Sequence, residues 1–185
     1  MDKNRVEHWN KGHKEKFQGM SYTHPMNQVP KHLNYIKGKK ILEIGPGDGR
    51  QLHLLKPYSK EYAIADISPV CLFQYEKSID KRYLINSFDD NFEDKFDVIC
   101  LFYVWHHVIS SETEAYMDFL ERHLNDEGHM CFNISKVGEQ DGHLDATKTT
   151  ARNPDEFKKF LIDRGYEIVF EKDGEPNNYL YLIKK

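Results

Sequence analysis

Residues 41–49 read ILEIGPGDG, and they set the architecture of the chain around them. The apolar run Ile41–Ile44 predicts a short strand, the glycines after it predict a tight turn, and residues 51–56 predict a helix. Glycines at every second position let the backbone pass close beneath a ligand, because no side chain stands in the way. A strand, a glycine-rich turn and a helix in this order predict the first unit of an α/β sheet that binds a ligand at its carboxyl end.

Strand and helix signals alternate along the rest of the chain. The predicted strands cover residues 41–44, 62–65, 83–85, 97–102, 130–134, 167–170 and 179–183. Helices are predicted to begin at Ser68-Pro69, at a capping box over Ser111–Glu114 whose helix ends at residues 125–128, and at Asn153-Pro154. The last two strands leave no room for a helical crossover between them, so they should pair antiparallel. We therefore predict an α/β fold with a doubly wound, mostly parallel, seven-stranded sheet and an antiparallel C-terminal hairpin.

Length and charge limit the classes of partner. The chain has 185 residues and a net charge of −4, which is typical of one globular domain. A surface that binds nucleic acid is usually strongly basic, so we expect no nucleic-acid partner. The longest apolar run, Val98–Trp105, is too short to span a bilayer, and no signal peptide is visible, so we expect no membrane partner. Oligomeric state stays open.

Cysteine and histidine usage indicates the compartment and the metal content. The three cysteines, Cys71, Cys100 and Cys131, are odd in number and widely spaced. Buried, reduced thiols in a reducing compartment explain them best, which predicts a cytoplasmic protein. The ten histidines include no pair at the spacing of metal ligands, so we expect no metal.

The acidic residue Asp66 ends the second predicted strand, 21 residues after Gly45. A carboxylate at this position can accept hydrogen bonds from both hydroxyls of a ribose. Two ligands compete for such a site: a dinucleotide and S-adenosylmethionine. The loop reads G-x-G-x-G, not the dinucleotide pattern G-x-G-x-x-G. Glu43 and Asp48 add negative charge that repels a pyrophosphate but suits an ammonium and a sulfonium, so electrostatics favours S-adenosylmethionine.

Three successive motifs resemble those of class I S-adenosylmethionine-dependent methyltransferases. They are residues 43–49, Ala65–Ser68, and Phe96–Ile99 leading into Trp105–His107. The resemblance covers about residues 39–134 and implies a Rossmann-like methyltransferase fold. It also implies that the glycines contact the methionine part, that Asp66 takes the ribose and that Ile67 packs on adenine. The predicted cofactor-binding residues are Glu43, Gly45, Pro46, Gly47, Gly49, Asp66, Ile67, Ser87, Phe88, Leu101 and Phe102.

The chain departs from the family at one point. Many members carry an acid after the third strand that meets the adenine amine. Here the segment reads Asn86-Ser87-Phe88, with acids only at Asp89 and Asp90. Ser87, backbone groups or Asp89 are the candidates for that contact.

The acceptor is expected beside His106 and His107, directly after the fourth strand. Histidine is the commonest general base near neutral pH, so both are catalytic candidates; the resemblance favours His107, and a packing role is the alternative. Residues 1–38 are predicted to form a helical lid on the methyltransferase domain of residues 39–185, within one compact domain. The lid and acceptor candidates are Trp9, Tyr22, His24, Met26 and His143; for Trp9 and Met26 the alternative is that they cap the core.

These features together predict an S-adenosylmethionine-dependent methyltransferase that acts on a small-molecule acceptor at oxygen or nitrogen. An Asn-Pro-Pro-Tyr motif, which marks family members acting on amide or adenine nitrogens, is absent. Two alternatives stay open. One is an NAD(P)-dependent oxidoreductase on a similar sheet, and the other is a non-catalytic protein that binds S-adenosylmethionine.

Overall fold

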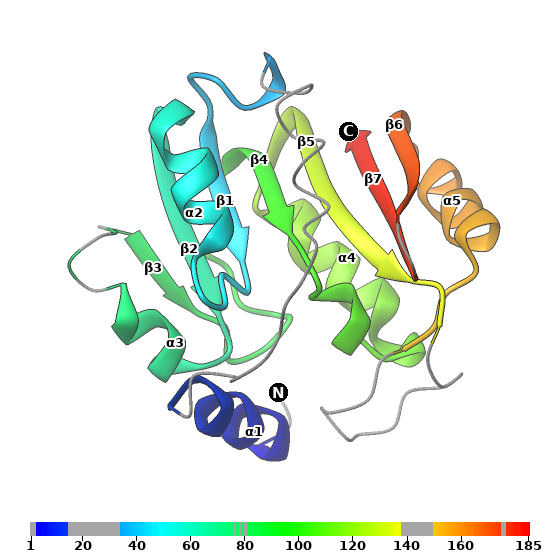
Figure 1. The fold of residues 1–185 in the computed structure, drawn as a ribbon. Coiled ribbons are helices and arrows are strands. Elements are labelled where there is room, and N and C mark those ends of the chain that lie inside the picture. The colour runs from blue at the N-terminus through cyan, green and yellow to red at the C-terminus, as the bar shows by residue number, and fades with distance from the viewer. Residues whose placement is uncertain are drawn as a thin grey trace.

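A seven-stranded sheet forms the centre of the structure (Figure 1). The computed structural model describes residues 3–14, 34–75, 77, 79, 81–137, 150–174 and 177–185. The strand order is β3-β2-β1-β4-β5-β7-β6. The strands are β1 (Lys40–Ile44), β2 (Glu61–Asp66), β3 (Lys81–Leu84), β4 (Phe96–Leu101), β5 (Leu124–Ser135), β6 (Glu167–Gly174) and β7 (Asn178–Lys184).

Pairing along the sheet confirms the predicted topology. Strands β1 to β5 pair in parallel, whereas β7 lies antiparallel between β5 and β6. The order changes direction at β1, where the chain goes first to β2 and β3 and later to β4. In open α/β sheets this switch point is where ligands bind, outside the carboxyl ends of the strands.

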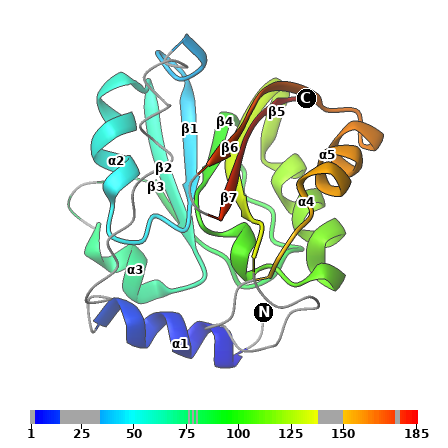
Figure 2. The same ribbon diagram turned by 45° about the vertical axis from the view of Figure 1, so that its right-hand side comes forward.

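Helices cover both faces of the sheet (Figure 2). On one face lie α2 (Arg50–Leu55) and α3 (Pro69–Gln74), and on the other lie α4 (Thr113–Arg122) and α5 (Pro154–Asp163). In both views α1 (Lys3–Lys14) lies across the carboxyl ends of the parallel strands. Short 3-10 turns are η2 (Lys56–Tyr58), η3 (Trp105–His107) and η4 (Ser110–Glu112). Among the described residues, no helix has both the length and the apolar character that crossing a bilayer requires.

Each face of the sheet has its own core. The central strands β1, β2 and β4 are almost completely buried, because helices cover them on both sides. The α4–α5 side is rich in aromatic rings, and the α2–α3 side contains all three cysteines, which are free thiols. Representative residues of the first core are Phe119, Phe132, Phe157 and Tyr181. Those of the second are Leu55, Tyr62, Leu72 and Leu182.

Two of the predicted helix starts are confirmed by their cap geometry. The Ser68 hydroxyl accepts a hydrogen bond from the Cys71 N–H at 3.1 Å, at the start of α3. The Asn153 side chain accepts from the Asp155 N–H at 2.9 Å, at the start of α5. In both helices the following proline has no N–H to leave unpaired.

Two predictions around α4 were wrong. The capping box over Ser111–Glu114 is absent: these residues overlap the 3-10 turn η4, and α4 begins at Thr113 without a side-chain cap. The polar residues 125–128 do not end the helix but belong to β5, which begins at Leu124 instead of Met130. Phe96 pairs with Leu124, and the register then shifts, so the extra residues form a bulge. Polar composition alone suggests a turn here, which is why the prediction failed.

Candidate functional site

The turn after β1 places bare backbone at the carboxyl edge of the sheet. The N–H of Gly45 (φ +66°) donates to the carbonyl of Ala65 at 2.9 Å, which ties the turn to β2. A Cβ atom on Gly45 would lie 2.6 Å from Cγ2 of Val104, too close for any side chain. A Cβ atom on Gly47 (φ +55°) would meet only the Gly45 carbonyl oxygen, at 4.0 Å. The space around Gly47 can therefore receive a ligand.

Further hydrogen bonds hold this turn in shape. The N–H of Gly49 donates to the Pro46 carbonyl at 2.8 Å, and Gly49 precedes α2. The Tyr75 hydroxyl donates to the Gly47 carbonyl at 2.8 Å. Because Tyr75 follows α3, the turn is braced by the helix that begins after β2.

Glu43 provides a buried carboxyl group beside the glycine turn. Its side chain is 1% exposed, and its Oε2 accepts a hydrogen bond from the Tyr62 hydroxyl at 2.8 Å. Burial, together with the charges of Asp48 and Asp66, raises the pKa of Glu43 to about 8. A cation bound nearby would favour the ionised carboxylate, so this site is prepared for a positively charged ligand.

Asp66 ends β2 and lies at the same edge. Its Oδ1 accepts a hydrogen bond from the Ser68 N–H at 2.7 Å, which fixes the carboxyl group in place. The side chain is 7% exposed, and burial raises its pKa to about 6. At neutral pH it is therefore mainly a carboxylate that can accept hydrogen bonds from hydroxyl groups.

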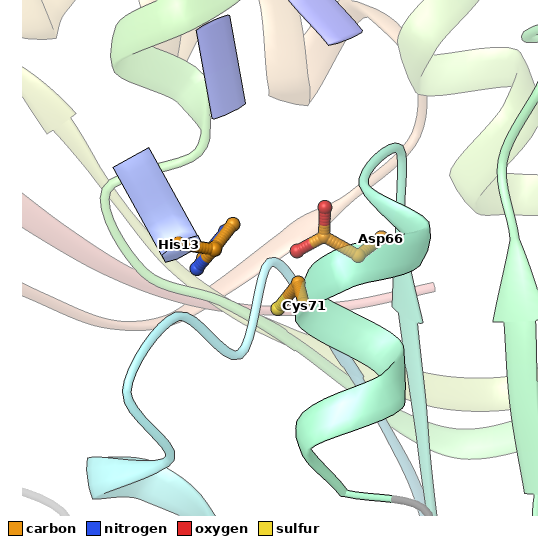
Figure 3. Close-up of side chains that lie close together, drawn as sticks. All are labelled: His13, Asp66 and Cys71. Carbon is orange, nitrogen blue, oxygen red and sulfur yellow. The ribbon is translucent and has the colours of Figure 1, made fainter. Parts of the chain in front are cut away.

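A cluster of His13, Asp66 and Cys71 lies at the end of β2 (Figure 3). One ligand atom of each residue lies within 4.8 Å of those of the other two, and all three residues are buried. Burial lowers the pKa of His13, so its ring is neutral and can accept a hydrogen bond. The cluster can hydrogen-bond a pair of hydroxyls, and its donor atoms also suit a divalent metal. Its members come from α1, β2 and α3, so sequence spacing gave no sign of it.

Helix α1 contacts both the segment that follows β2 and the turns η3 and η4 that follow β4. The Ser68 hydroxyl donates to Oδ1 of Asn10 at 2.6 Å, and the Arg5 guanidinium forms an ion pair with Glu112 at 3.0 Å. Between these two contacts, the ring of Trp9 meets that of His107 edge-on, with centroids 4.8 Å apart. Trp9, a predicted lid residue, therefore contacts the predicted catalytic residue His107. The other lid and acceptor candidates, Tyr22, His24, Met26 and His143, lie outside the described residues.

The adjacent histidines of η3 differ in environment. His106 is 8% exposed, and its Nε2 lies 3.3 Å from the side-chain nitrogen of Asn133. Burial and the neighbouring charges of His107 and Arg152 lower the pKa of His106 to about 3. His107 is half-buried and lies against Trp9. Of the two, His107 has the position of a group that can face a ligand at this edge.

Two residues that the sequence gave no reason to select hold η3 in place. Tyr103, directly after β4, has φ +61°, a left-handed conformation that bulky residues rarely adopt. Its N–H donates to Oδ1 of Asn133 at 2.7 Å. The guanidinium of Arg152 donates to the carbonyls of Trp105 at 2.8 Å and Val108 at 2.7 Å. Backbone strain maintained by such contacts is concentrated at functional sites.

The turn after β3 is closed by hydrogen bonds among its own residues, including its acidic side chains. The Asp90 carboxylate accepts hydrogen bonds from the backbone N–H groups of Asn86 at 2.7 Å and Ser87 at 3.2 Å. The Ser87 hydroxyl accepts from the Asp89 N–H at 3.1 Å. The remaining predicted cofactor residues lie near this end of the sheet. Ile67 and Phe88 are half-buried against the first core, and Leu101 and Phe102 are buried at the end of β4.

A family comparison agrees with this geometry. Residues 25–169 match the family model described as a methyltransferase domain. No curated protein matches the chain by sequence.

Solved structures share the fold at low sequence identity. The 1,6-didemethyltoxoflavin-N1-methyltransferase of Burkholderia thailandensis, with bound 1,6-didemethyltoxoflavin and S-adenosylhomocysteine, is 13% identical with a TM-score of 0.74, covering 98% of this chain and 85% of that one. The DhpI-SAM-HEP complex is 16% identical with a TM-score of 0.73, covering 98% and 95%. The N-methyltransferase NodS of Bradyrhizobium japonicum WM9, in complex with S-adenosylhomocysteine, is 15% identical with a TM-score of 0.66, covering 95% and 97%.

Proposed function

The chain belongs to the methyltransferase domain family, and on that premise we propose that it methylates a small-molecule acceptor. It is a class I methyltransferase by its sheet, and its methyl donor is S-adenosylmethionine. The family decides against the alternative of a nicotinamide-dependent oxidoreductase.

The observation that carries this proposal is the pair of buried carboxyl groups around the glycine turn. Glu43 and Asp66 flank a backbone that has room for a ligand at Gly47. The Asp66 carboxylate repels a pyrophosphate, whereas the ammonium and sulfonium of S-adenosylmethionine favour the ionised form of both Asp66 and Glu43. We assign Asp66 to the ribose hydroxyls and the turn with Glu43 to the methionine part. The residues present therefore fit this cofactor.

We propose His107 as the general base of the reaction. The bound cofactor supplies a methyl group on a positively charged sulfur. His107 lies at the same strand edge and can take the proton that an acceptor hydroxyl loses as it attacks the methyl group, or the proton that an ammonium must lose beforehand to free its lone pair. The ring of Trp9 covers one side of His107 and excludes water there. His106, whose pKa is about 3, is a weak base, and we propose that it positions η3.

We propose that residues 1–38 act as a lid on the catalytic domain of residues 39–185. Its described helix, α1, contacts Ser68 beside the donor site and His107 beside the acceptor site. Closing this helix would cover both ligands together and hold them out of water.

The acceptor is proposed to be a small molecule methylated at oxygen or nitrogen. The net charge of −4 gives no general attraction for nucleic acid. Two proteins of the same fold are named as N-methyltransferases, one of them with its small-molecule ligand bound. We propose a cytoplasmic location because all three cysteines are free, buried thiols.

Cofactor binding and methyl transfer test this function separately. S-adenosylhomocysteine should raise the unfolding temperature of the purified protein, whereas NAD should not. Incubation of the protein and S-adenosylmethionine with metabolite extracts should then yield a product about 14 daltons heavier than its precursor, absent without protein. Protection by NAD alone would overturn the proposal. Binding of S-adenosylhomocysteine without any methylated product would instead indicate a non-catalytic binding protein.

A further inference from the structure

The cluster of His13, Asp66 and Cys71 is brought together by the docking of α1 against the start of α3 (Figure 3). The Ser68 hydroxyl joins the two helices, because it accepts from the Cys71 N–H at 3.1 Å and donates to Oδ1 of Asn10 at 2.6 Å. Asn10 and His13 are three positions apart and are therefore neighbours on the surface of α1. The contact at Ser68 thus brings the His13 ring to the end of β2, beside the other two side chains.

The three side chains are too enclosed to receive a sugar in this arrangement. His13 is 8% exposed, Asp66 is 7% exposed and Cys71 is 0% exposed. A ribose can therefore bind at Asp66 only when α1 lies farther from the end of β2 than it does here. A single ion needs no such space, because it sits between ligand atoms that already lie within 4.8 Å of one another. The docked position of α1 thus suits an ion better than it suits the cofactor.

The donor atoms identify the class of ion. An imidazole nitrogen, a carboxylate oxygen and a thiol sulfur are ligands of zinc, whereas magnesium and calcium prefer oxygen alone. Zinc bonds of about 2.0–2.3 Å place the ligand atoms about 3.3–3.8 Å apart, so from separations within 4.8 Å each side chain would move by about 1 Å or less. The Ser68 N–H also holds the Asp66 carboxylate at 2.7 Å, and carboxylates that bind metals are commonly oriented by such hydrogen bonds.

We propose that His13, Asp66 and Cys71 bind a zinc ion, with water in the fourth position, and that zinc and the cofactor exclude each other. The Cys71 thiol loses its proton to water as the sulfur–zinc bond forms, and no oxidation state changes. The ion links α1 to β2 and α3 and holds the helix over Asp66. The exclusion rests on the proposed function, specifically on Asp66 as the ribose residue, whereas the metal site does not. The expectation of no metal came from spacing along the chain, which does not reveal ligands from three separate elements.

Cobalt(II) tests the site without any cofactor, because it can replace zinc and its spectrum reports the ligands. Untagged full-length protein, stripped of metal, should gain a sulfur-to-cobalt charge-transfer band in the near ultraviolet and the strong visible bands of a four-coordinate ion. Cys71→Ser should abolish the charge-transfer band. Cys131→Ser is the matched control, because Cys131 is also a buried free thiol but lies on β5, outside the cluster, and it should leave the spectrum unchanged. No band in the wild type, or an equal band in Cys71→Ser, would overturn the metal site.

His13→Ala measures the contribution of α1 to this site. It should weaken zinc binding about 100-fold or more in competition with a chromophoric chelator, because even an outer hydrogen bond to a ligand contributes about 10- to 100-fold. His8→Ala is the control: His8 lies on the same helix but outside the cluster, so zinc affinity should match that of the wild type. Equal zinc affinity in His13→Ala and the wild type would remove α1 from the site and overturn the proposal.

Calorimetry with S-adenosylhomocysteine then tests the exclusion. Zinc at about ten times its dissociation constant should lower the apparent affinity of the wild type about tenfold, and a chelator should restore it. His13→Ala should show almost no effect at the same zinc concentration. Zinc binding without loss of affinity for S-adenosylhomocysteine would overturn the exclusion. Absence of S-adenosylhomocysteine binding in the presence of chelator would refute the proposed function, whereas the cobalt spectrum would still decide the metal site.

Discussion

The donor half and the acceptor half of the strand edge are built in different ways. Glu43, Gly45 and Asp66 lie within one strand–helix–strand segment, and backbone hydrogen bonds such as Gly45 to Ala65 lock them together. The acceptor half is assembled from Trp9, His107 and Arg152, which lie on segments far apart in the chain. The donor half therefore depends on local backbone geometry, and the acceptor half on tertiary contacts.

The largest expected effect distinguishes the two histidines of the acceptor half. With an acceptor in hand, His107→Gln should lower kcat about 100-fold or more, because a general base contributes roughly 10²–10⁴. Affinity for S-adenosylhomocysteine should stay within about twofold, since the donor half is untouched. His106→Gln is the control: it should lower the unfolding temperature, and its loss of kcat should be much smaller than that of His107→Gln. If the two variants lose kcat equally, the base has been assigned to the wrong residue.

The next effect concerns the donor half alone. Asp66→Asn should weaken S-adenosylmethionine binding about 10- to 100-fold in calorimetry, because hydrogen bonds to a charged group contribute about 1.5–3 kcal/mol. Asp48→Asn is the comparison, because Asp48 is an exposed carboxylate in the same glycine loop, paired with Arg50. It should change affinity much less. Equal losses would mean that general negative charge, and not a ribose contact, sets the affinity.

A third prediction separates backbone strain from close packing. Gly45→Ala and Gly38→Ala both place a side chain at positive φ, +66° and +74°, but only the former meets Val104. Urea unfolding should show that Gly45→Ala destabilises the protein by about 1–3 kcal/mol more, since β-branched Val104 cannot rotate away freely. Adding Val104→Ala should recover most of the excess. Equal destabilisation in the two single variants would show that the contact with Val104 is unimportant.

The smallest expected effect is the pH dependence of donor binding. The pKa of Asp66 is about 6 and that of Glu43 is about 8, and a cationic ligand favours the ionised form of both. Binding should therefore release protons, so affinity for S-adenosylmethionine should rise about tenfold from pH 6 to pH 8. Calorimetry in buffers of different ionisation enthalpy measures the protons released. Glu43→Gln should remove most of the rise, because Asp66 is already about half ionised at pH 6; a flat profile in the wild type would contradict the assignment.

The two halves also differ in how far sequence predicts them. The strand before the glycine turn, the position of Asp66 and the cap at Ser68 all follow from short-range patterns, and the structure has them in place. The mostly parallel sheet followed from the alternation of strands and helices, and the antiparallel hairpin from the short connection between the last two strands. No local pattern brings His13 to Asp66, or Arg152 to η3, because packing between distant segments sets those contacts.

Helix α1 is held at two points, by the ion pair of Arg5 with Glu112 and by the hydrogen bond of Asn10 with Ser68. In the lid proposed above, one helix would cover both the donor and the acceptor, so S-adenosylhomocysteine and the methylated product would leave after the same opening step. We expect product release, and not methyl transfer, to be the rate-limiting step of such an enzyme. Removing either contact would then raise kcat and would also make the bound ligands dissociate faster.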